Sequence, residues 1–126
     1  IFNIYRALKS QGYFIVTVPQ HKWLWSVADD AANHCRRYTH SEITSKIVKS
    51  GFKVIYSTSF VSLLLPLMAL QRFSSRRRNY NPDDEFKIRP ILNAALYKVM
   101  QFEFSLLRLG LRFPVGGSLL LLARKP

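Results

Sequence analysis

The chain has 126 residues and a mass of 14.7 kDa, which is enough for one domain and too little for two. Hydrophobic residues make up 48% of it and charged residues 21%, a composition that excludes a disordered or collagen-like chain. Lys and Arg number 19 against 7 Asp and Glu, and the formal net charge of +12 favours anionic partners such as nucleic acid, lipid headgroups or an acidic ligand.

A helical pattern opens the chain, with apolar residues recurring on one face over residues 1–9 and Gly12 as the stop signal. The pattern is already under way at Ile1 and nothing there resembles a signal peptide, so we expect a piece of a longer chain. The apolar, β-branched run Tyr13–Val18 predicts a strand that is covered on both faces and ends at Pro19.

The next stretch, Gln20–Tyr38, has neither helical nor strand periodicity and predicts a long connection without regular structure. Such connections are uncommon in compact domains and are usually functional. Thr39 and Glu42 have the spacing of a capping box at the start of a helix over residues 40–50. A further strand is expected at Phe52–Ser57, and the order strand, helix, strand predicts two parallel strands with a right-handed crossover.

The second half of the chain begins with an apolar run that predicts a helix over residues 60–73. A polar loop follows, then a helix over residues 90–108 that starts with a proline, and a third strand at Ser118–Ala123. Glu103 falls on the apolar side of the second of these helices. Because an unpaired buried carboxylate is costly, we expect a structural partner for it, either a distant arginine or loop backbone.

Seven segments carry a family pattern, and they are Ala7–Pro19, His21–Ser26, His34–Thr39, Glu42, Ser50–Phe52, Phe113–Ser118 and Ala123–Pro126. Together they resemble bacterial class I S-adenosylmethionine-dependent methyltransferases, and the resemblance covers essentially the whole chain. It implies a partial Rossmann-like α/β fold in a single domain over residues 1–126. The implied sheet is three-stranded and mixed, in the order 13–18, 118–123, 52–57 with the middle strand antiparallel, and residues 60–117 are a helical insertion between the last two strands.

The family binds its cofactor, S-adenosylmethionine, with a Gly-rich loop and an acidic residue, and neither is recognisable here. No Gly-x-Gly occurs, and the adjacent glycines Gly116 and Gly117 lie near the carboxyl end. The resemblance therefore implies the carboxyl-terminal half of a methyltransferase for a small-molecule or lipid-linked acceptor, with no cofactor-binding residues and no activity on its own. In such a half Tyr13–Val18 is an open apolar edge, through which we expect the fragment to self-associate.

The stretch Gln20–Tyr38 leaves the carboxyl end of a predicted strand, where open α/β sheets bind ligands. His21 is the candidate catalytic base, because an imidazole can accept a hydroxyl proton near neutral pH. Indoles in the same stretch can form a dry wall around a reacting methyl group. The candidate substrate-binding residues are Trp23, Trp25, Asp29, His34, Arg37 and Tyr38.

Each of these residues also has a structural interpretation, which the sequence leaves open. The tryptophans can cover the core, and His34 can fix the loop through hydrogen bonds. An aspartate of the pair Asp29-Asp30 can form an ion pair with an arginine of the pair Arg36-Arg37. Tyr38, directly before the capping box, can be a hydrophobic staple.

The single cysteine, Cys35, excludes an internal disulfide and a cysteine-based zinc finger and suits a reducing, cytoplasmic compartment. No metal site is expected, because the spacing of His21, His34, Cys35 and His40 matches no zinc signature.

The apolar run Phe60–Leu70 gives only about 16 Å of helix and cannot cross a hydrocarbon layer of roughly 30 Å. It can instead be a buried cap, a wall for an apolar substrate, or a contact with the inner face of an anionic membrane. Nearby arginines favour the last of these. The alternative to an enzyme is a non-catalytic basic module for such a membrane or, less favoured, for nucleic acid, whose usual motifs are missing. The expected membrane contacts are Leu63, Leu64, Leu67, Arg76, Arg77 and Arg78.

Overall fold

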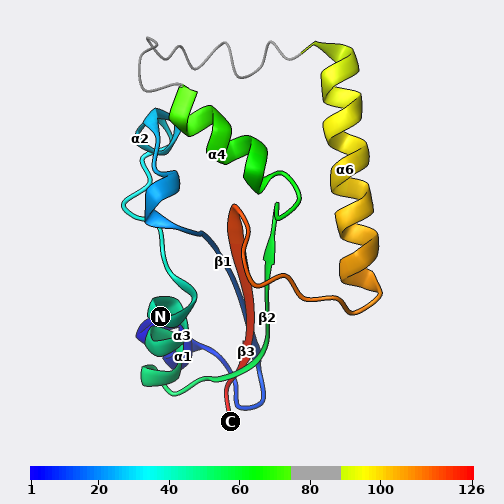
Figure 1. The fold of residues 1–126 in the computed structure, drawn as a ribbon. Helices are drawn as coiled ribbons and strands as arrows, with labels where there is room; N and C mark the ends of the chain where they lie inside the picture. The colour runs from blue at the N-terminus through cyan, green and yellow to red at the C-terminus, as the bar shows by residue number, and fades with distance from the viewer. Residues whose placement is uncertain (75–88) are drawn as a thin grey trace.

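A computed structural model describes residues 1–74 and 89–126, and its fold is mixed α/β with an open three-stranded sheet (Figure 1). The helices lie before, between and beside the strands rather than in a separate bundle. In chain order the elements are α1 (Phe2–Ala7), β1 (Tyr13–Pro19), the 3-10 turn η1 (Lys22–Leu24), α2 (Val27–Ala31), α3 (His40–Lys49), β2 (Lys53–Phe60), α4 (Leu65–Ser74), α6 (Pro90–Arg108) and β3 (Ser118–Arg124).

The last strand occupies the middle of the sheet, where β3 pairs antiparallel with β1 on one side and with β2 on the other. Consequently β1 and β2 run in the same direction without touching each other. The predicted order, with 118–123 antiparallel in the middle of the sheet, agrees with this pairing. The prediction of a mixed sheet is wrong, because both pairings are antiparallel. A bulge between Val54 and Tyr56 leaves the side chain of Ile55 exposed.

Several element boundaries differ from those predicted by local pattern. β2 continues to Phe60, which lies opposite Ser118 of β3, so α4 begins at Leu65 rather than at residue 60. Pairing with a distant strand, which the apolar run itself does not specify, sets this boundary. The first helix is also shorter than residues 1–9.

The connection between β1 and α3 contains more regular structure than we predicted. η1 and α2 both form within it, and an isolated parallel bridge joins Gln20 to Tyr38 at its two ends. The prediction of a structureless stretch over Gln20–Tyr38 is therefore wrong. The capping box at the start of α3 is confirmed, since Thr39 and Glu42 accept hydrogen bonds from each other's backbone N–H groups.

The hydrophobic core lies between the sheet and the two helices α1 and α3 (Figure 1). Phe52 is its aromatic centre, with ring centroids 5.0 Å from Tyr5 and 5.2 Å from Phe14. This core is small, and helices cover one face of the sheet. The fully buried members of the core are Ile43, Ile47, Phe52, Leu119, Leu121 and Ala123.

The other face of the sheet carries apolar side chains that remain in solvent. Tyr13 and Ile15 of β1 lie opposite Arg124 and Leu122 of β3 on this face, and the two β1 side chains are 58% and 65% exposed. In the part of the chain that the structure describes, β1 pairs with β3 alone, so its second edge presents free backbone groups. The sheet is therefore open both at the β1 edge and on one face.

Candidate functional site

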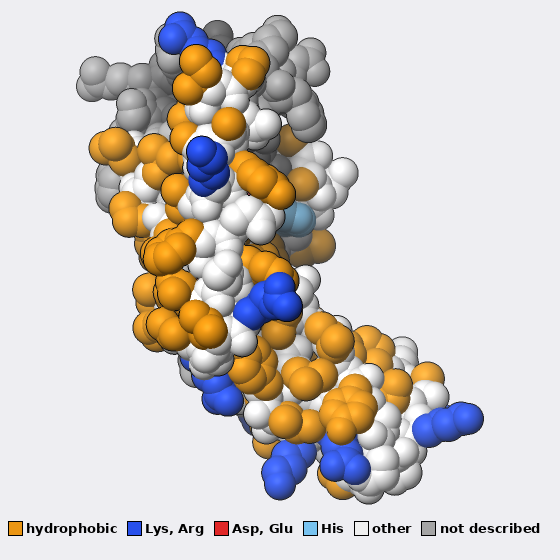
Figure 2. All heavy atoms as spheres, turned by 90° about the vertical axis from the view of Figure 1, so that its right-hand side faces the viewer, with side chains coloured by type: hydrophobic (Ala, Val, Ile, Leu, Met, Phe, Trp, Pro, Cys, Tyr) orange, Lys and Arg blue, Asp and Glu red, His pale blue; other side chains and the backbone are white. Residues whose placement is uncertain are grey.

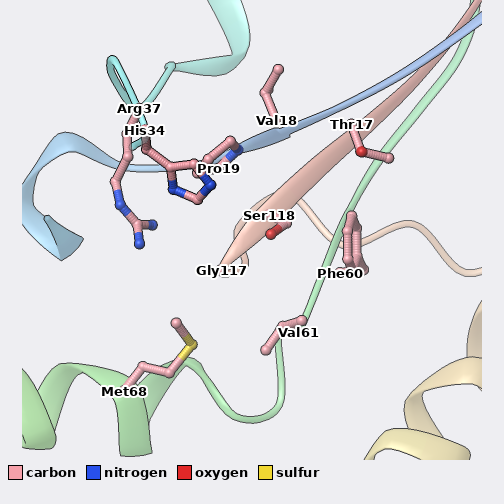
Figure 3. A pocket seen from close by; sticks show the side chains of 10 residues that line it. All are labelled: Thr17, Val18, Pro19, His34, Arg37, Phe60, Val61, Met68, Gly117 and Ser118. Carbon is pink, nitrogen blue, oxygen red and sulfur yellow. The ribbon is translucent and has the colours of Figure 1, made fainter. Parts of the chain in front are cut away.

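A pocket of about 370 Å³ lies where β1 and β2 end and β3 begins (Figure 3). Figure 3 shows His34 and Arg37 on one wall, Phe60 and Val61 on the opposite wall, and Met68 of α4 below them. The pocket lies beyond the carboxyl ends of two strands that run in the same direction, which is where α/β sheets bind ligands. Its lining residues are Thr17, Val18, Pro19, His34, Arg37, Phe60, Val61, Met68, Gly117 and Ser118.

A buried ion pair forms the base of the wall that carries His34. Asp29 and Arg37 are 2% and 7% exposed, and the guanidinium donates twice to the carboxylate, at 3.1 Å from Nε and 3.0 Å from Nη2. The remaining Nη1 of Arg37 donates to the carbonyl oxygen of Gln20 at 3.0 Å. Of the ion pairs that the sequence left open, the one between Asp29 and Arg37 is confirmed. The ion pair and the bond to Gln20, which we call the Asp29–Arg37 clamp, hold the connection between β1 and α3 against the end of β1.

The ionisation state of Asp29 follows from these contacts. Burial by itself raises the pKa of this carboxyl, but hydrogen bonds from Arg37 and His34 outweigh burial and hold the pKa below its ordinary value. Ser26 donates to the same carboxylate through its backbone N–H at 2.9 Å and its hydroxyl at 3.2 Å. Asp29 is therefore an anion that only accepts hydrogen bonds.

His34 is oriented by this anion and faces the pocket. Its Nδ1 lies 3.1 Å from Oδ1 of Asp29. Because an ionised carboxylate cannot donate, Nδ1 carries a proton, and in the neutral imidazole Nε2 is then the acceptor. The side chain is about half exposed and lines the pocket. The hydrogen bond confirms that His34 fixes the loop, and the same side chain lines the pocket.

His21, the predicted base, does not line this pocket. Its ring stacks against Trp23 with centroids 5.7 Å apart, and its Nε2 is buried without a hydrogen-bond partner among the described residues. Burial first, and then the positive charge of Arg37, lowers the pKa of the His21 imidazole, so the ring stays neutral. Its backbone has φ 61°, a left-handed conformation that non-glycine residues rarely adopt. The structure thus brings His21 next to the clamp but outside the cavity.

The remaining predicted contacts lie outside the pocket lining. Trp23 and Trp25 are exposed, and the indole of Trp25 donates to Asp30 at 3.1 Å. Tyr38 packs against the core cluster that includes Ile43, which is the position of a hydrophobic staple. The structure therefore brings His34 and Arg37 into the pocket, with Asp29 behind them, and leaves the two indoles and Tyr38 elsewhere.

The opposite wall contains residues that we did not predict. Val61 follows β2 with φ 58°, an outlier for a β-branched residue, and its carbonyl accepts a hydrogen bond from Gly117 at 3.2 Å. A Cβ atom on Gly117 would lie 3.1 Å from Sδ of Met68, so glycine allows α4 to approach the start of β3. The pair Gly116-Gly117 is the sequence signal that could have indicated this close approach.

Glu103 holds α6 to the turn after β2. Its carboxylate is 1% exposed, and Oε2 accepts the backbone N–H groups of Ser62 and Leu63, each at 2.8 Å. The expectation of a structural partner is confirmed, and the partner is loop backbone rather than an arginine. Since Ser62 directly follows Val61, this contact also supports the wall of the pocket.

The structure describes only part of the predicted membrane contacts. Leu63 and Leu67 are exposed and Leu64 is half-buried, whereas residues 76–78 lie outside the described residues. Over residues 1–74 and 89–126, no helix has both the length and the apolar content needed to cross a bilayer. Within the same two segments, no three His, Cys, Asp or Glu side chains are grouped so that they can hold a metal ion.

Comparison with known proteins adds no family to these observations: no family model, curated protein or solved structure matches the chain. What the site can do chemically follows from its own groups. An imidazole with a free Nε2, fixed by a buried carboxylate and facing an apolar wall, can take a proton from a hydroxyl or amine bound in the pocket.

Proposed function

We propose that the chain is the acceptor-facing, carboxyl-terminal part of an S-adenosylmethionine-dependent methyltransferase with a Rossmann-like sheet. The acceptor is a small-molecule or lipid-linked hydroxyl or amine. The observation that carries the proposal is the Asp29–His34 pair at the pocket beyond the ends of β1 and β2. The sequence segments that resemble this family include the whole stretch from His34 to Thr39 and therefore one member of that pair.

The role of each pocket residue follows from its contacts. Nε2 of His34 accepts the proton that the acceptor loses as its oxygen or nitrogen becomes methylated, and Asp29 stabilises the imidazolium that results. Arg37 keeps Asp29 ionised and fixed. Phe60, Val61 and Met68 provide an apolar wall that excludes water from the acceptor.

The residues present do not form the cofactor site of the family. The sequence has no Gly-x-Gly, and Asp29, the buried acid next to the pocket, is already occupied by Arg37 and His34. We therefore assign the binding of S-adenosylmethionine to chain that continues the sheet beyond β1. The free edge of β1 and the exposed apolar side chains of Tyr13 and Ile15 support this assignment, because such surfaces are normally covered.

The test is methyl transfer by the protein translated from its complete reading frame. With S-adenosylmethionine labelled in the methyl group, and with lipid and aqueous extracts of the source cells as acceptors, we expect label in product. His34→Ala should lower the rate about a hundredfold, since a positioned base contributes roughly that factor. His40→Ala is the matched control, because His40 is an exposed histidine that bonds Ser57 and does not line the pocket.

The contrary results are equally specific. A rate of methyl transfer that His34→Ala leaves unchanged would contradict the role of His34 as the base. If the reading frame opens immediately before Ile1 and its protein transfers no label to either extract, the proposal of a methyltransferase is wrong.

A further inference from the structure

The longest helix of the described residues is held in place by a polar contact and leaves most of its apolar side chains in solvent. α6 has 19 residues, and Glu103 is the one residue of the helix that is fully buried. Ile91 and Leu109, at and just beyond its two ends, are 86% and 78% exposed. An exposed apolar surface of this extent on a folded protein marks a contact with another protein or with a membrane.

Part of the exposed apolar surface forms a stripe along α6, while Leu92, Tyr97 and Phe104 are exposed outside it. At 100° per residue, Ile91, Ala95, Phe102 and Leu109 fall within about 40° of one another along the helix. Aromatic rings of α6 are exposed as well, and aromatic residues are favoured at the boundary between headgroups and acyl chains. The stripe extends over about 28 Å, the length of a 19-residue helix.

The basic residues along α6 indicate what kind of partner surface the stripe contacts. Arg89, Lys98, Arg108 and Arg112 lie along and beside α6 from one end to the other, and the one acid of the segment, Glu103, is buried by its backbone partners. Figure 2 shows this side of the molecule with hydrophobic and basic side chains and without an acidic one among the described atoms. Cations spread along an apolar helix complement a plane of phosphate groups, as in helices that lie flat in a membrane interface.

We propose that α6 docks the protein onto an anionic lipid bilayer, with Phe102 and the stripe around it inserted below the headgroups and Lys98 and Arg108 on the phosphates. The contact lies on α6, outside the residues 60–78 that the sequence singled out. It does not depend on methyl transfer, and it makes an acceptor embedded in or carried by the membrane accessible to the chain.

The experiment is flotation of the complete chain with vesicles of phosphatidylcholine alone or with about 30% phosphatidylserine, at about 0.1 M and about 0.5 M NaCl. We expect flotation only with the anionic vesicles and a loss of binding at the higher salt. Phe102→Asp, and separately Lys98→Glu with Arg108→Glu, should each weaken the partition about tenfold or more. All three side chains are exposed, so circular dichroism should be unchanged.

Matched controls come from α3, on the other side of the molecule (Figure 1). Val48→Asp, and separately Lys46→Glu with Lys49→Glu, make the same changes of charge at exposed positions and should float like the unaltered chain. Equal flotation with both kinds of vesicle, or equal loss in the α3 variants, would overturn the proposal. So would binding to duplex nucleic acid in place of vesicles, or a dimer that Phe102→Asp dissociates with no effect on flotation.

Discussion

At the scale of single residues, Asp29 organises the candidate site. It accepts hydrogen bonds from Ser26, His34 and Arg37 while lying almost entirely out of solvent. A buried carboxylate of this kind serves two purposes at once, because the same bonds that offset its desolvation also fix the imidazole that faces the pocket.

Replacing Asp29 should therefore be costly to stability. Asp29→Asn leaves the buried guanidinium of Arg37 without its counter-charge, and loss of one partner of a buried pair costs about 3–5 kcal/mol. Asp30→Asn is the matched control, since Asp30 is exposed and its carboxylate bonds only the indole of Trp25 among the described contacts. Urea unfolding measures both. Equal losses for the two variants would contradict the ion-pair argument.

Glu42 should make the stability of the chain depend on pH in acid. The hydrogen bond from Lys22, followed by those from the backbone and hydroxyl of Thr39, lowers the pKa of Glu42 from 4.5 to about 2. Because the folded pKa is depressed, this contribution is complete above pH 4.5 and is lost as the pH falls to about 2. Glu42→Gln should remove that part of the pH dependence of the urea midpoint. If the urea midpoint of Glu42→Gln changes with pH over this range as steeply as that of the unaltered chain, the charge of Glu42 does not contribute to stability.

At the scale of elements, Glu103 is the tether between α6 and the turn after β2. Glu103→Ala leaves the N–H groups of Ser62 and Leu63 without an acceptor, which should cost about 2–3 kcal/mol. Glu103→Gln keeps a carbonyl oxygen for both donors and should preserve the protection of these two amides, although its NH2 group takes the buried position of Oε1, which has no hydrogen-bond partner among the described residues. Faster hydrogen exchange at these two amides in the alanine variant alone is the measurement. Identical exchange rates in both variants would show that Glu103 does not protect these two amides.

Local signals allowed some elements to be predicted well. α6 runs over the predicted residues 90–108, and the capping box of α3 forms as its spacing indicates, because both depend on neighbours within four positions. The end of β2 was missed because its last residues pair with β3, about sixty residues further on. Local pattern also could not indicate that His34 lines the pocket and His21 does not, because the opposite wall comes from Val61 and α4, which lie far away in the sequence.

At the scale of the whole molecule, the open edge of β1 should make the isolated chain associate with itself. An apolar edge strand with one free row of backbone groups is a template for another strand. Ile15→Lys should shift the chain to a monomer in sedimentation velocity, because a lysine on an edge opposes pairing. Val48→Lys, at an exposed position on α3, should leave the association unchanged. A monomeric unaltered chain would contradict an exposed pairing edge.

The open edge and the missing glycine-rich loop have a single explanation in the proposed function, which is that the strands that bind the cofactor continue the sheet beyond β1. Calorimetric titration with S-adenosylmethionine compares the 126-residue chain with the protein from the complete reading frame. We predict saturable binding by the longer protein and no specific heat from the shorter one. Micromolar binding by the 126-residue chain alone, or none by either protein, would contradict the account.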